Sequence, residues 1–523
     1  MVVRNYKKWT LLAAMLLLAV AGCTVGPDYH RPNAAVAAAY SELPGSNAVT
    51  QASRAVTNSP SLQRWWTVFR DPELDSLIDR AVKGNPDLLQ ALSRVRQARA
   101  QRAVVAAGLL PEFDASSGFD YGRGSKNVVL PLGGLGGASS GASGQKAKLG
   151  EPKKMDASTP GSAPQGGLGS PFGLGGLPGV TTEIYQVGAG TSWDIDIFGG
   201  TRRAIEAARA ALEASEEDRR TVLVALLAEV ATNYVDLRAQ QQRLEIAREN
   251  LAAQRETLAI LQARFTNGLS TELDVSQQTA EVNATLSVIP PLQSAERVSL
   301  HLLAFLIGQQ PSALVNELSP RQPLSALPAE VPVGLPSDLL RRRPDIRRAE
   351  RQLAAASAQI GAATAGLYPK FSLTAVAGLD ASQPGNLFEW GSRYFGVSPG
   401  VSWPILDWGR IHGSIHVQNE LEKQSLAAYQ NAVLGALREV EDALVFYANE
   451  QSRRASLSEE VRASQTSLRL ARKAYEAGLA DLLTVLNSER SLLSAQDALA
   501  QSDGAIRADL VKLYVALGGG WEQ

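Results

Sequence analysis

Cysteine is almost absent from this 523-residue sequence, which contains only Cys23. A single thiol can form neither an internal disulfide nor a four-sulfur zinc site. An excess of either charge is also missing, because 51 lysines and arginines are balanced by 52 aspartates and glutamates. This balance excludes a broad basic face for nucleic acid, so no nucleic-acid partner is expected.

Signatures of catalysis and of metal binding are missing as well. No nucleophile elbow, phosphate-binding loop or dinucleotide fingerprint stands between a predicted strand and a predicted helix. His412 and His416 have the spacing of a zinc-binding helix but lack the glutamate that a metalloprotease carries beside its first histidine. The run Arg341-Arg342-Arg343 is better explained as a salt-bridged surface than as a ligand site. We therefore expect no enzymatic activity, no metal ion and no cofactor.

Long apolar runs occur only at the N-terminus. Basic residues precede an apolar run of about 14 residues, Trp9–Gly22, which is too short to span a bilayer and is typical of a secretory signal peptide over 1–22. Small residues then precede Cys23, which is the arrangement of a bacterial lipoprotein processing site, so we predict a lipid on this thiol. The alternative is a buried cysteine after an ordinary signal peptide. Thr24 rather than aspartate follows the cysteine, which by the usual sorting rule indicates the outer membrane.

One architecture occurs twice in the sequence. Residues 86–113 align without gaps with 344–371, at an offset of 258 positions. Further along, pairs such as Gly268 with Gly478 match at an offset of 210. The difference must be extra sequence in the first copy, and it falls in 131–180, which holds 15 of the 45 glycines. Such a composition has too little apolar surface to order itself, so we expect a mobile extracellular loop.

Alternating polarity predicts strands in each copy. Odd positions from Tyr185 to Ile197 are mainly apolar, and the even positions between them are polar or glycine. The same period of two occurs over 371–379 and 395–405, and more weakly over 113–121. In a soluble sandwich the apolar face would cover a core, whereas in a membrane barrel it would face lipid. The lipoprotein signal favours the membrane barrel.

Very long helices are predicted after each strand pair. The segment 201–265 contains neither glycine nor proline, so about 65 residues can form one helix of roughly 100 Å. Apolar side chains recur along it every seven residues, which favours coiled-coil packing. They are Val230, Leu237, Leu244, Leu251, Leu258 and Phe265. The second copy keeps this phase, and shorter helices follow both Gly-Leu pairs at 268–269 and 478–479. The alternative is a coiled-coil hairpin without a membrane function.

Membrane crossing would have to use strands, since no run outside the N-terminus reaches the roughly 18 apolar residues of a spanning helix. Four strands cannot close a barrel, because bacterial outer-membrane barrels have about eight strands or more and open edges are not tolerated in lipid. Either the chain oligomerises to complete its barrel, or the strand prediction is wrong.

Several strings of residues resemble the signatures of one family. They are Cys23-Thr24-Val25-Gly26-Pro27-Asp28-Tyr29 with Arg31-Pro32, Trp65-Trp66 with Phe69 and Asp71-Pro72, Pro336-Ser337-Asp338-Leu339-Leu340, and Arg342-Arg343-Pro344-Asp345-Ile346-Arg347 with Ala349-Glu350. With these strings the chain resembles the TolC-like outer-membrane efflux lipoproteins, the NodT-type outer-membrane factors of tripartite resistance-nodulation-division pumps. The resemblance covers essentially the whole mature chain apart from the glycine-rich insert.

The resemblance implies an α+β membrane fold with two internal structural repeats. Three protomers would each give four β-strands to a twelve-stranded outer-membrane barrel, and their long coiled-coil helices would form a periplasmic α-barrel. This homotrimer would be the passive exit duct of an efflux pump for drugs or other small molecules. Its partners would be a periplasmic adaptor (membrane fusion) protein, an inner-membrane resistance-nodulation-division transporter and outer-membrane lipid. The competing interpretation is a lipidated periplasmic coiled-coil adaptor, which would need one hairpin rather than two copies.

The same resemblance assigns candidate site residues. The set at the periplasmic tips, where the adaptor would dock, is Gly268, Leu269, Gly478 and Leu479. The set on the closing helices of the second copy, which would form the gate, is Tyr475, Leu483 and Asn487. Family members often carry an aspartate at the last position, so Asn487 argues against carboxylate-based cation binding and leaves Leu483 as the better plug. For the tip glycines, the alternative is a turn without any partner.

These observations divide the chain into a signal peptide, a lipidated N-terminal segment, two repeats joined by an equatorial linker, and a C-terminal tail. The corresponding ranges are 1–22, 23–85, 86–308, 309–343, 344–518 and 519–523. Within the repeats we predict strands over 111–122, 183–197, 369–380 and 394–406, a glycine-rich insert over 123–182, long helices over 200–266 and 409–476, and tip turns over 267–270 and 477–480.

Overall fold

The computed structural model describes residues 24–33, 36–42, 54–56, 62–123 and 181–521. The predicted lipid site at Cys23 and most of the predicted insert at 123–182 lie outside this part of the chain. The chain divides into two compact units. The strand unit contains Ala107–Phe198 and Leu367–Leu406, and the helical unit contains Thr24–Ala106, Gly199–Gly366 and Asp407–Gln523.

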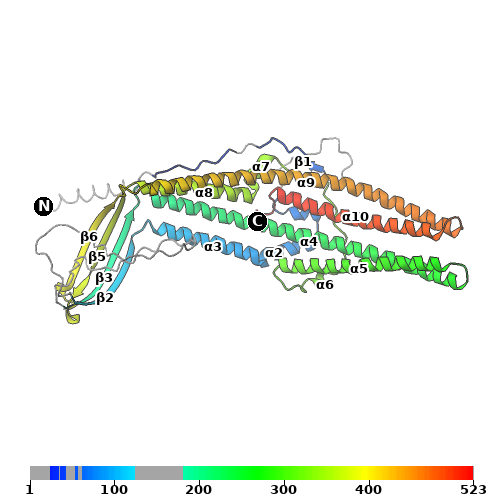
Figure 1. Cartoon of the computed structure of the whole chain (residues 1–523), viewed down its shortest axis with the longest axis horizontal. Coiled ribbons are helices and arrows are strands. Elements are labelled where there is room, and N and C mark those ends of the chain that lie inside the picture. The colour runs from blue at the N-terminus through cyan, green and yellow to red at the C-terminus, as the bar shows by residue number, and fades with distance from the viewer. Residues whose placement is uncertain (1–23, 34–35, 43–53, 57–61, 124–180, 522–523) are drawn as a thin grey trace, which may run out of the picture. The chain divides into compact units, whose positions relative to one another are not determined.

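Four strands form one antiparallel sheet in the strand unit, in the order β2-β3-β5-β6 (Figure 1). They are β2 (Glu112–Arg123), β3 (Thr181–Ile195), β5 (Lys370–Ala381) and β6 (Arg393–Ser402). Each copy contributes one pair, β2-β3 or β5-β6, and the copies join where β3 pairs with β5. Among the described residues, β2 and β6 each pair on one side only, so the sheet has two open edges.

The strand ends differ from the predicted ranges, most of all in β6. This strand stops at Ser402 rather than at 406. Pro404 has no N–H to donate to a neighbouring strand, so the pairing ends before it. Similarly, β3 stops at Ile195 rather than at 197, because the amide of Ile197 donates back to the Ile195 carbonyl at 2.9 Å and turns the chain.

One face of the sheet is apolar and is not covered by the described residues. On β6, Phe395, Val397 and Val401 are exposed and alternate with small or polar residues, as the period of two predicts. The β2-β3 pairing sets Phe119 opposite Tyr185, with ring centroids 4.7 Å apart on the same face. An exposed apolar face of this extent is typical of contact with lipid or with another protein.

Two helical hairpins make up most of the helical unit (Figure 1). In the first copy α4 (Gly200–Thr266) is followed by α5 (Glu272–Leu306), and in the second α9 (Arg410–Glu476) is followed by α10 (Leu482–Ala516). The matched helices have equal lengths, 67 residues for α4 and α9 and 35 residues for α5 and α10. The start of α9 is one residue later than predicted, because Gly409 has a φ of 84° and lies outside the helix.

Shorter elements precede each strand pair and connect the repeats. The helices are α2 (Pro72–Gly84), α3 (Pro86–Ala107), α6 (Val315–Leu318), α7 (Pro336–Arg342) and α8 (Pro344–Thr364). A short parallel pair joins β1 (Arg54–Val56) to β4 (Glu330–Pro332), and 3₁₀ turns cover Trp65–Phe69, Ala365–Leu367, Pro384–Asn386 and Trp390–Ser392. In the described ranges no helix has the length and apolar content needed to cross a bilayer.

Burial along α4 follows the predicted seven-residue repeat over most of its length. Val230, Leu237 and Leu251 are buried against neighbouring helices. Beyond them the buried position passes to Leu261, whereas the predicted Phe265 is 44% exposed. A straight helix with about 3.6 residues per turn drifts away from a strict seven-residue repeat, which accounts for this correction.

The main core joins both copies to the segment that precedes α2. Trp66 is fully buried, and the ring of Trp65 stacks on Tyr514 of α10 with centroids 5.6 Å apart. The Tyr234 hydroxyl of α4 donates to Asp71 at 2.7 Å, and the other oxygen of Asp71 caps the start of α2. The Trp-Trp and Asp-Pro strings noted in the sequence therefore fix the N-terminal segment on the long helices.

Glycines with positive φ end the helices of both hairpins. Gly268, Gly308, Gly478 and Gly518 have φ values between 71° and 77°. At each one the glycine amide donates to the carbonyl three residues earlier and the next amide donates to the carbonyl five residues earlier. This is the Schellman arrangement, in which glycine adopts a left-handed conformation without a Cβ clash. The four positions form two pairs at the offset of 210 seen in the sequence.

These glycines differ in their surroundings, which predicts unequal effects of the same substitution. A Cβ at Gly308 would lie 2.2 Å from the Gly84 carbonyl oxygen, whereas a Cβ at Gly268 would meet nothing within 4 Å. Gly268→Ala should therefore cost only the left-handed conformation, roughly 1–2 kcal/mol. Gly308→Ala should cost about 1–3 kcal/mol more, because backbone must move. Urea unfolding followed by helical circular dichroism would measure both variants, and equal losses of stability would contradict this packing.

Candidate functional site

The two hairpin tips present exposed apolar side chains on fixed turns. At the second tip, the Leu479 amide donates to the Ala474 carbonyl at 2.8 Å and the Gly478 amide to the Tyr475 carbonyl at 3.0 Å. The side chains of Leu269 and Leu479 are 69% and 84% exposed. The turns therefore hold two leucines outward, and outside the chain neighbours of each tip glycine no described atom lies within 4 Å of its Cβ position.

The helix that follows each turn is capped, which stabilises its first turn. The Thr271 hydroxyl accepts from the Asp274 amide, and the Asp274 carboxylate accepts from the Thr271 amide at 2.9 Å. At the second tip, Asp481 accepts from the Thr484 amide at 3.0 Å and from its hydroxyl at 2.6 Å. These hydrogen bonds from Thr484 lower the pKa of Asp481 below its usual range. Capping of this kind satisfies backbone N–H groups that have no partner within the helix.

An apolar cluster behind the tips joins the two hairpins. We call it the tip cluster; its buried members are Leu261, Ala471, Leu482, Val485 and Leu486, with Val275, Leu468 and Tyr475 packed against them. All four hairpin helices contribute to it. The guanidinium of Arg264 lies 5.8 Å from the Tyr475 ring centroid. The structure thus places Tyr475 within the contact between the hairpins.

The other two candidate gate residues lie on an exposed stripe of α10. Leu483 is 43% exposed, and Asn487 lies one turn further along the same face. Arg490 continues this stripe and donates to the Asn487 side-chain oxygen at 3.4 Å. Leu483 and Asn487 are therefore brought together, whereas Tyr475 packs against the tip cluster. Their role in closing a channel stays a prediction.

Sequence reasoning missed the ion pairs that join the hairpins beyond the tip cluster. Arg490 pairs with Glu281 of α5, and Arg243 of α4 makes two contacts to Asp497 of α10, at 2.7 Å and 3.1 Å. These side chains line a groove of about 330 Å³ between the hairpins. Partners more than 200 positions apart leave no local pattern, although Arg490 stands on the same helical stripe as the predicted gate.

The arginine run at 341–343 was expected to lie on the surface, but one of its three residues is buried. Arg343 is buried and pairs with Asp345 and Glu439, both at 2.7 Å, and donates to the Ala516 carbonyl at 2.8 Å. A buried guanidinium needs such acceptors to offset its lost hydration. The predicted ion pairing is present, but for Arg343 it lies inside the protein. In the part of the chain that the structure describes, no group of three or more histidine, cysteine or carboxylate side chains could hold a metal ion.

Comparison with known proteins places these features in a family. The model of the outer membrane efflux protein family matches residues 77–309 and 335–519. The chain is 32% identical to the pyoverdine export outer membrane protein OpmQ of Pseudomonas aeruginosa over 518 residues, which cover 99% of this chain and 98% of that protein. It is 31% identical over 509 residues to nodulation protein T of Rhizobium leguminosarum bv. trifolii, with 96% of each covered. Its fold matches the outer-membrane channel OprN with a TM-score of 0.79 and 33% identity, covering 96% of this chain and 100% of that one.

The chain belongs to the outer membrane efflux protein family, because the family model matches well over half of it. It is an outer-membrane protein that serves as the exit duct of an efflux pump. The predicted α+β channel fold with long helices and two repeats is confirmed. The competing interpretation as a periplasmic adaptor is set aside, because the match extends over both repeats and the chain carries two hairpins. The family is one of channel and efflux proteins rather than of known enzymes.

Proposed function

We propose that three copies of the chain assemble into one exit duct that spans the outer membrane and extends into the periplasm. The open edges of β2 and β6 support this assembly, because unpaired backbone groups are not tolerated in hydrocarbon. Four strands from each of three copies would give a closed barrel of twelve. The exposed apolar face that includes Phe395 and Val397 would then meet lipid.

The helical hairpins of the three copies would form the periplasmic tunnel. Leu434, Phe446 and Leu470 on α9 are each more than half exposed in the single chain. Single exposed apolar side chains are common on protein surfaces, so these three become contacts between proteins only because the open sheet edges call for neighbouring copies. The proposed partner is a second copy of the chain. Its α4 has the same length as α9, so the two helices could lie side by side along their full length.

The duct itself would be passive. An inner-membrane resistance-nodulation-division transporter would supply the energy, and the duct would conduct the drugs or other small molecules to the exterior. No catalytic residue and no cofactor is needed for this role, apart from a covalent lipid on Cys23. A periplasmic adaptor would join the two membranes by contacting the hairpin tips. The observation that carries this part of the proposal is the pair of capped turns that hold Leu269 and Leu479 outward.

Closure would depend on Leu483 rather than on a ring of charge. Three symmetry copies of an exposed leucine around an axis can close a narrow pore by excluding water. Asn487 on the same stripe carries no charge, and its side-chain oxygen accepts from Arg490. Divalent cations therefore have no carboxylate at this position to bind.

Lipidation gives the first test. Cys23→Ser should abolish incorporation of labelled fatty acid, because the variant has no thiol to accept the lipid. The measurement is the label on the purified protein after growth with the labelled fatty acid, with the wild type as control. Incorporation by the serine variant at the wild-type level would show that the lipid is not on this residue.

Docking at the tips gives the second test. Gly478→Trp or Gly268→Trp should reduce drug efflux several-fold without lowering the amount of trimer, because the indole would project from a turn that only the adaptor contacts. Gly409→Trp is a matched control, since Gly409 also has a positive φ, 84°, and a Cβ there also meets no atom within 4 Å outside its chain neighbours. Efflux is measured as drug accumulation in cells and trimer by unheated gel electrophoresis. Normal efflux in both tip variants would contradict docking at these turns.

The gate gives the third test. Leu483→Ser should raise the single-channel conductance of purified protein in planar bilayers, because a hydroxyl no longer excludes water from the constriction. Leu479→Ser at the tip and Asn487→Ala on the same stripe should change conductance less. Strong block of the wild-type channel by divalent cations, abolished by Asn487→Ala, would overturn the assignment of Leu483 as the plug.

A further inference from the structure

The first described residues of the chain lie on the helical unit as a strap. We use this name for Thr24–Arg31, which directly follows Cys23 in the sequence. Arg203 of α4, whose side chain is 5% exposed, holds one end of the strap. Its guanidinium donates to the Val25 carbonyl at 3.1 Å, to the Gly26 carbonyl at 3.3 Å and to the Asp28 carboxylate at 2.7 Å.

Glycines on both sides bring the strap backbone into direct contact with the helices. Gly26 has a φ of 91°, and a Cβ there would lie 2.4 Å from the Gly361 Cα of α8. A Cβ on Gly361 would in turn lie 2.9 Å from the Val25 carbonyl oxygen. At the start of α4, a Cβ on Gly199 would lie 2.9 Å from the Thr24 Cα. The contact therefore requires the absence of side chains at three separate positions.

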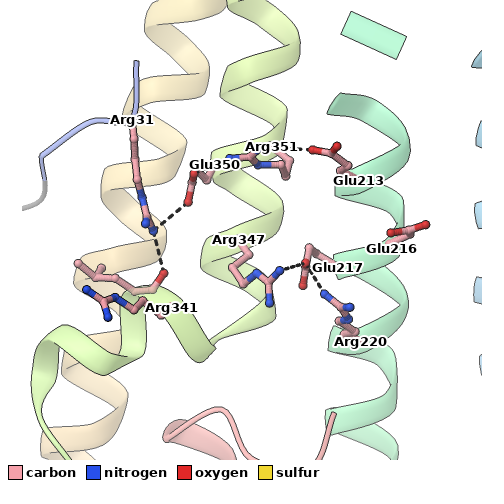
Figure 2. A pocket seen from close by; sticks show the side chains of 10 residues that line it. Arg31, Glu213, Glu216, Glu217, Arg220, Arg341, Arg347, Glu350 and Arg351 are labelled. Carbon is pink, nitrogen blue, oxygen red and sulfur yellow. Dashed lines mark hydrogen bonds and ion pairs between the residues drawn. The ribbon is translucent and has the colours of Figure 1, made fainter. Parts of the chain in front are cut away.

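A second arginine holds the other end of the strap, and Figure 2 shows it reaching across to the helices. Arg31 pairs with Glu350 of α8 at 3.0 Å and donates to the Leu340 carbonyl of α7 at 3.1 Å. Glu350 is nearly buried and also pairs with Arg351, which reaches Glu213 of α4 at 3.2 Å. Ion pairs thus join the strap to α8 and α4, and the hydrogen bond to Leu340 joins it to α7.

The burial of Arg203 indicates that this surface is built for the strap. A guanidinium removed from water needs hydrogen-bond acceptors around it. Three of the acceptors of Arg203 belong to the strap, and the fourth is Glu206 on its own helix, at 2.8 Å. The hydrogen bond and the charge of Arg203 lower the pKa of Asp28 below its usual range. Without the strap, Arg203 would lose most of its partners.

We propose that this surface is a dock that fixes the attachment point of the lipid anchor, with Arg203 as its positioning residue. The inference rests on the proposed lipidation of Cys23. One peptide unit of about 3.8 Å joins a residue to its neighbour, whereas eight extended residues reach roughly 26–29 Å. A docked strap therefore holds Thr24 beside Gly199, at the beginning of α4, and the lipid would be attached one residue before Thr24. A released strap would leave the lipid on a long free tether.

Limited digestion with chymotrypsin tests the dock on the full-length protein from cells grown with labelled palmitate. Cleavage after Tyr29 releases the labelled peptide Cys23–Tyr29 and exposes a new N-terminus at His30, which mass spectrometry quantifies with or without lipid. A protease needs a locally released segment, so docking slows this cleavage. Gly26→Val alters only the strap, and Arg203→Gln removes its main donor. Both should speed the cleavage roughly tenfold or more.

Arg243→Gln is the matched control, because Arg243 lies on the same helix but pairs with Asp497 of α10, at 2.7 Å, and with no residue of the strap network. It should leave the cleavage rate at the wild-type value. Equal rates in the wild type, Gly26→Val and Arg203→Gln would overturn the dock while the label on the released peptide still supports lipidation. Faster cleavage in the two variants without any label on the peptide would instead overturn lipidation, and with it the anchoring role of the dock.

Discussion

Two rows of backbone groups, on the outer sides of β2 and β6, have no partner in the four-stranded sheet that the structure describes. In hydrocarbon every such N–H and C=O must be paired, so a sheet of this kind cannot remain open in an outer membrane. The apolar face of the sheet points to the same environment. Phe395, Val397 and Val401 are exposed on it, and lipid would cover them on the outside of a closed barrel. The proposed assembly with further copies would meet both requirements at once.

Each chain contains the same helical hairpin twice, so an assembly of several copies would be built from one repeated unit. The hairpins have equal helix lengths, and their ends are set by glycines in matched left-handed turns, Gly268 with Gly478 and Gly308 with Gly518. The matched turns differ in what surrounds them. Gly308 lies against Gly84, whereas a Cβ at either tip glycine would meet no atom within 4 Å outside its chain neighbours. Close packing at one end of the hairpins and uncovered apolar turns at the other suit a duct whose tips meet a partner.

Much of the fold could be predicted from the sequence, because its strongest signals are local. The alternation from Tyr185 onward indicated β3, and the absence of glycine and proline over 201–265 indicated α4. Errors arose where one residue overrides a pattern, as Pro404 does by ending β6 early. The candidate gate residues were named from the family resemblance. The ion pairs beside them and the dock of the strap could not be predicted from the sequence. Arg203 with Asp28, and Arg490 with Glu281, are joined only by the tertiary fold.

Assembly through the open edges of the sheet is the central claim, and native mass spectrometry of the purified protein in detergent tests it directly. The protein should have the mass of three lipidated chains, and disulfide trapping between cysteines placed on β2 and β6 should link one chain to the next. A folded single chain with its full helical content, and no links between β2 and β6 of different copies, would contradict the account.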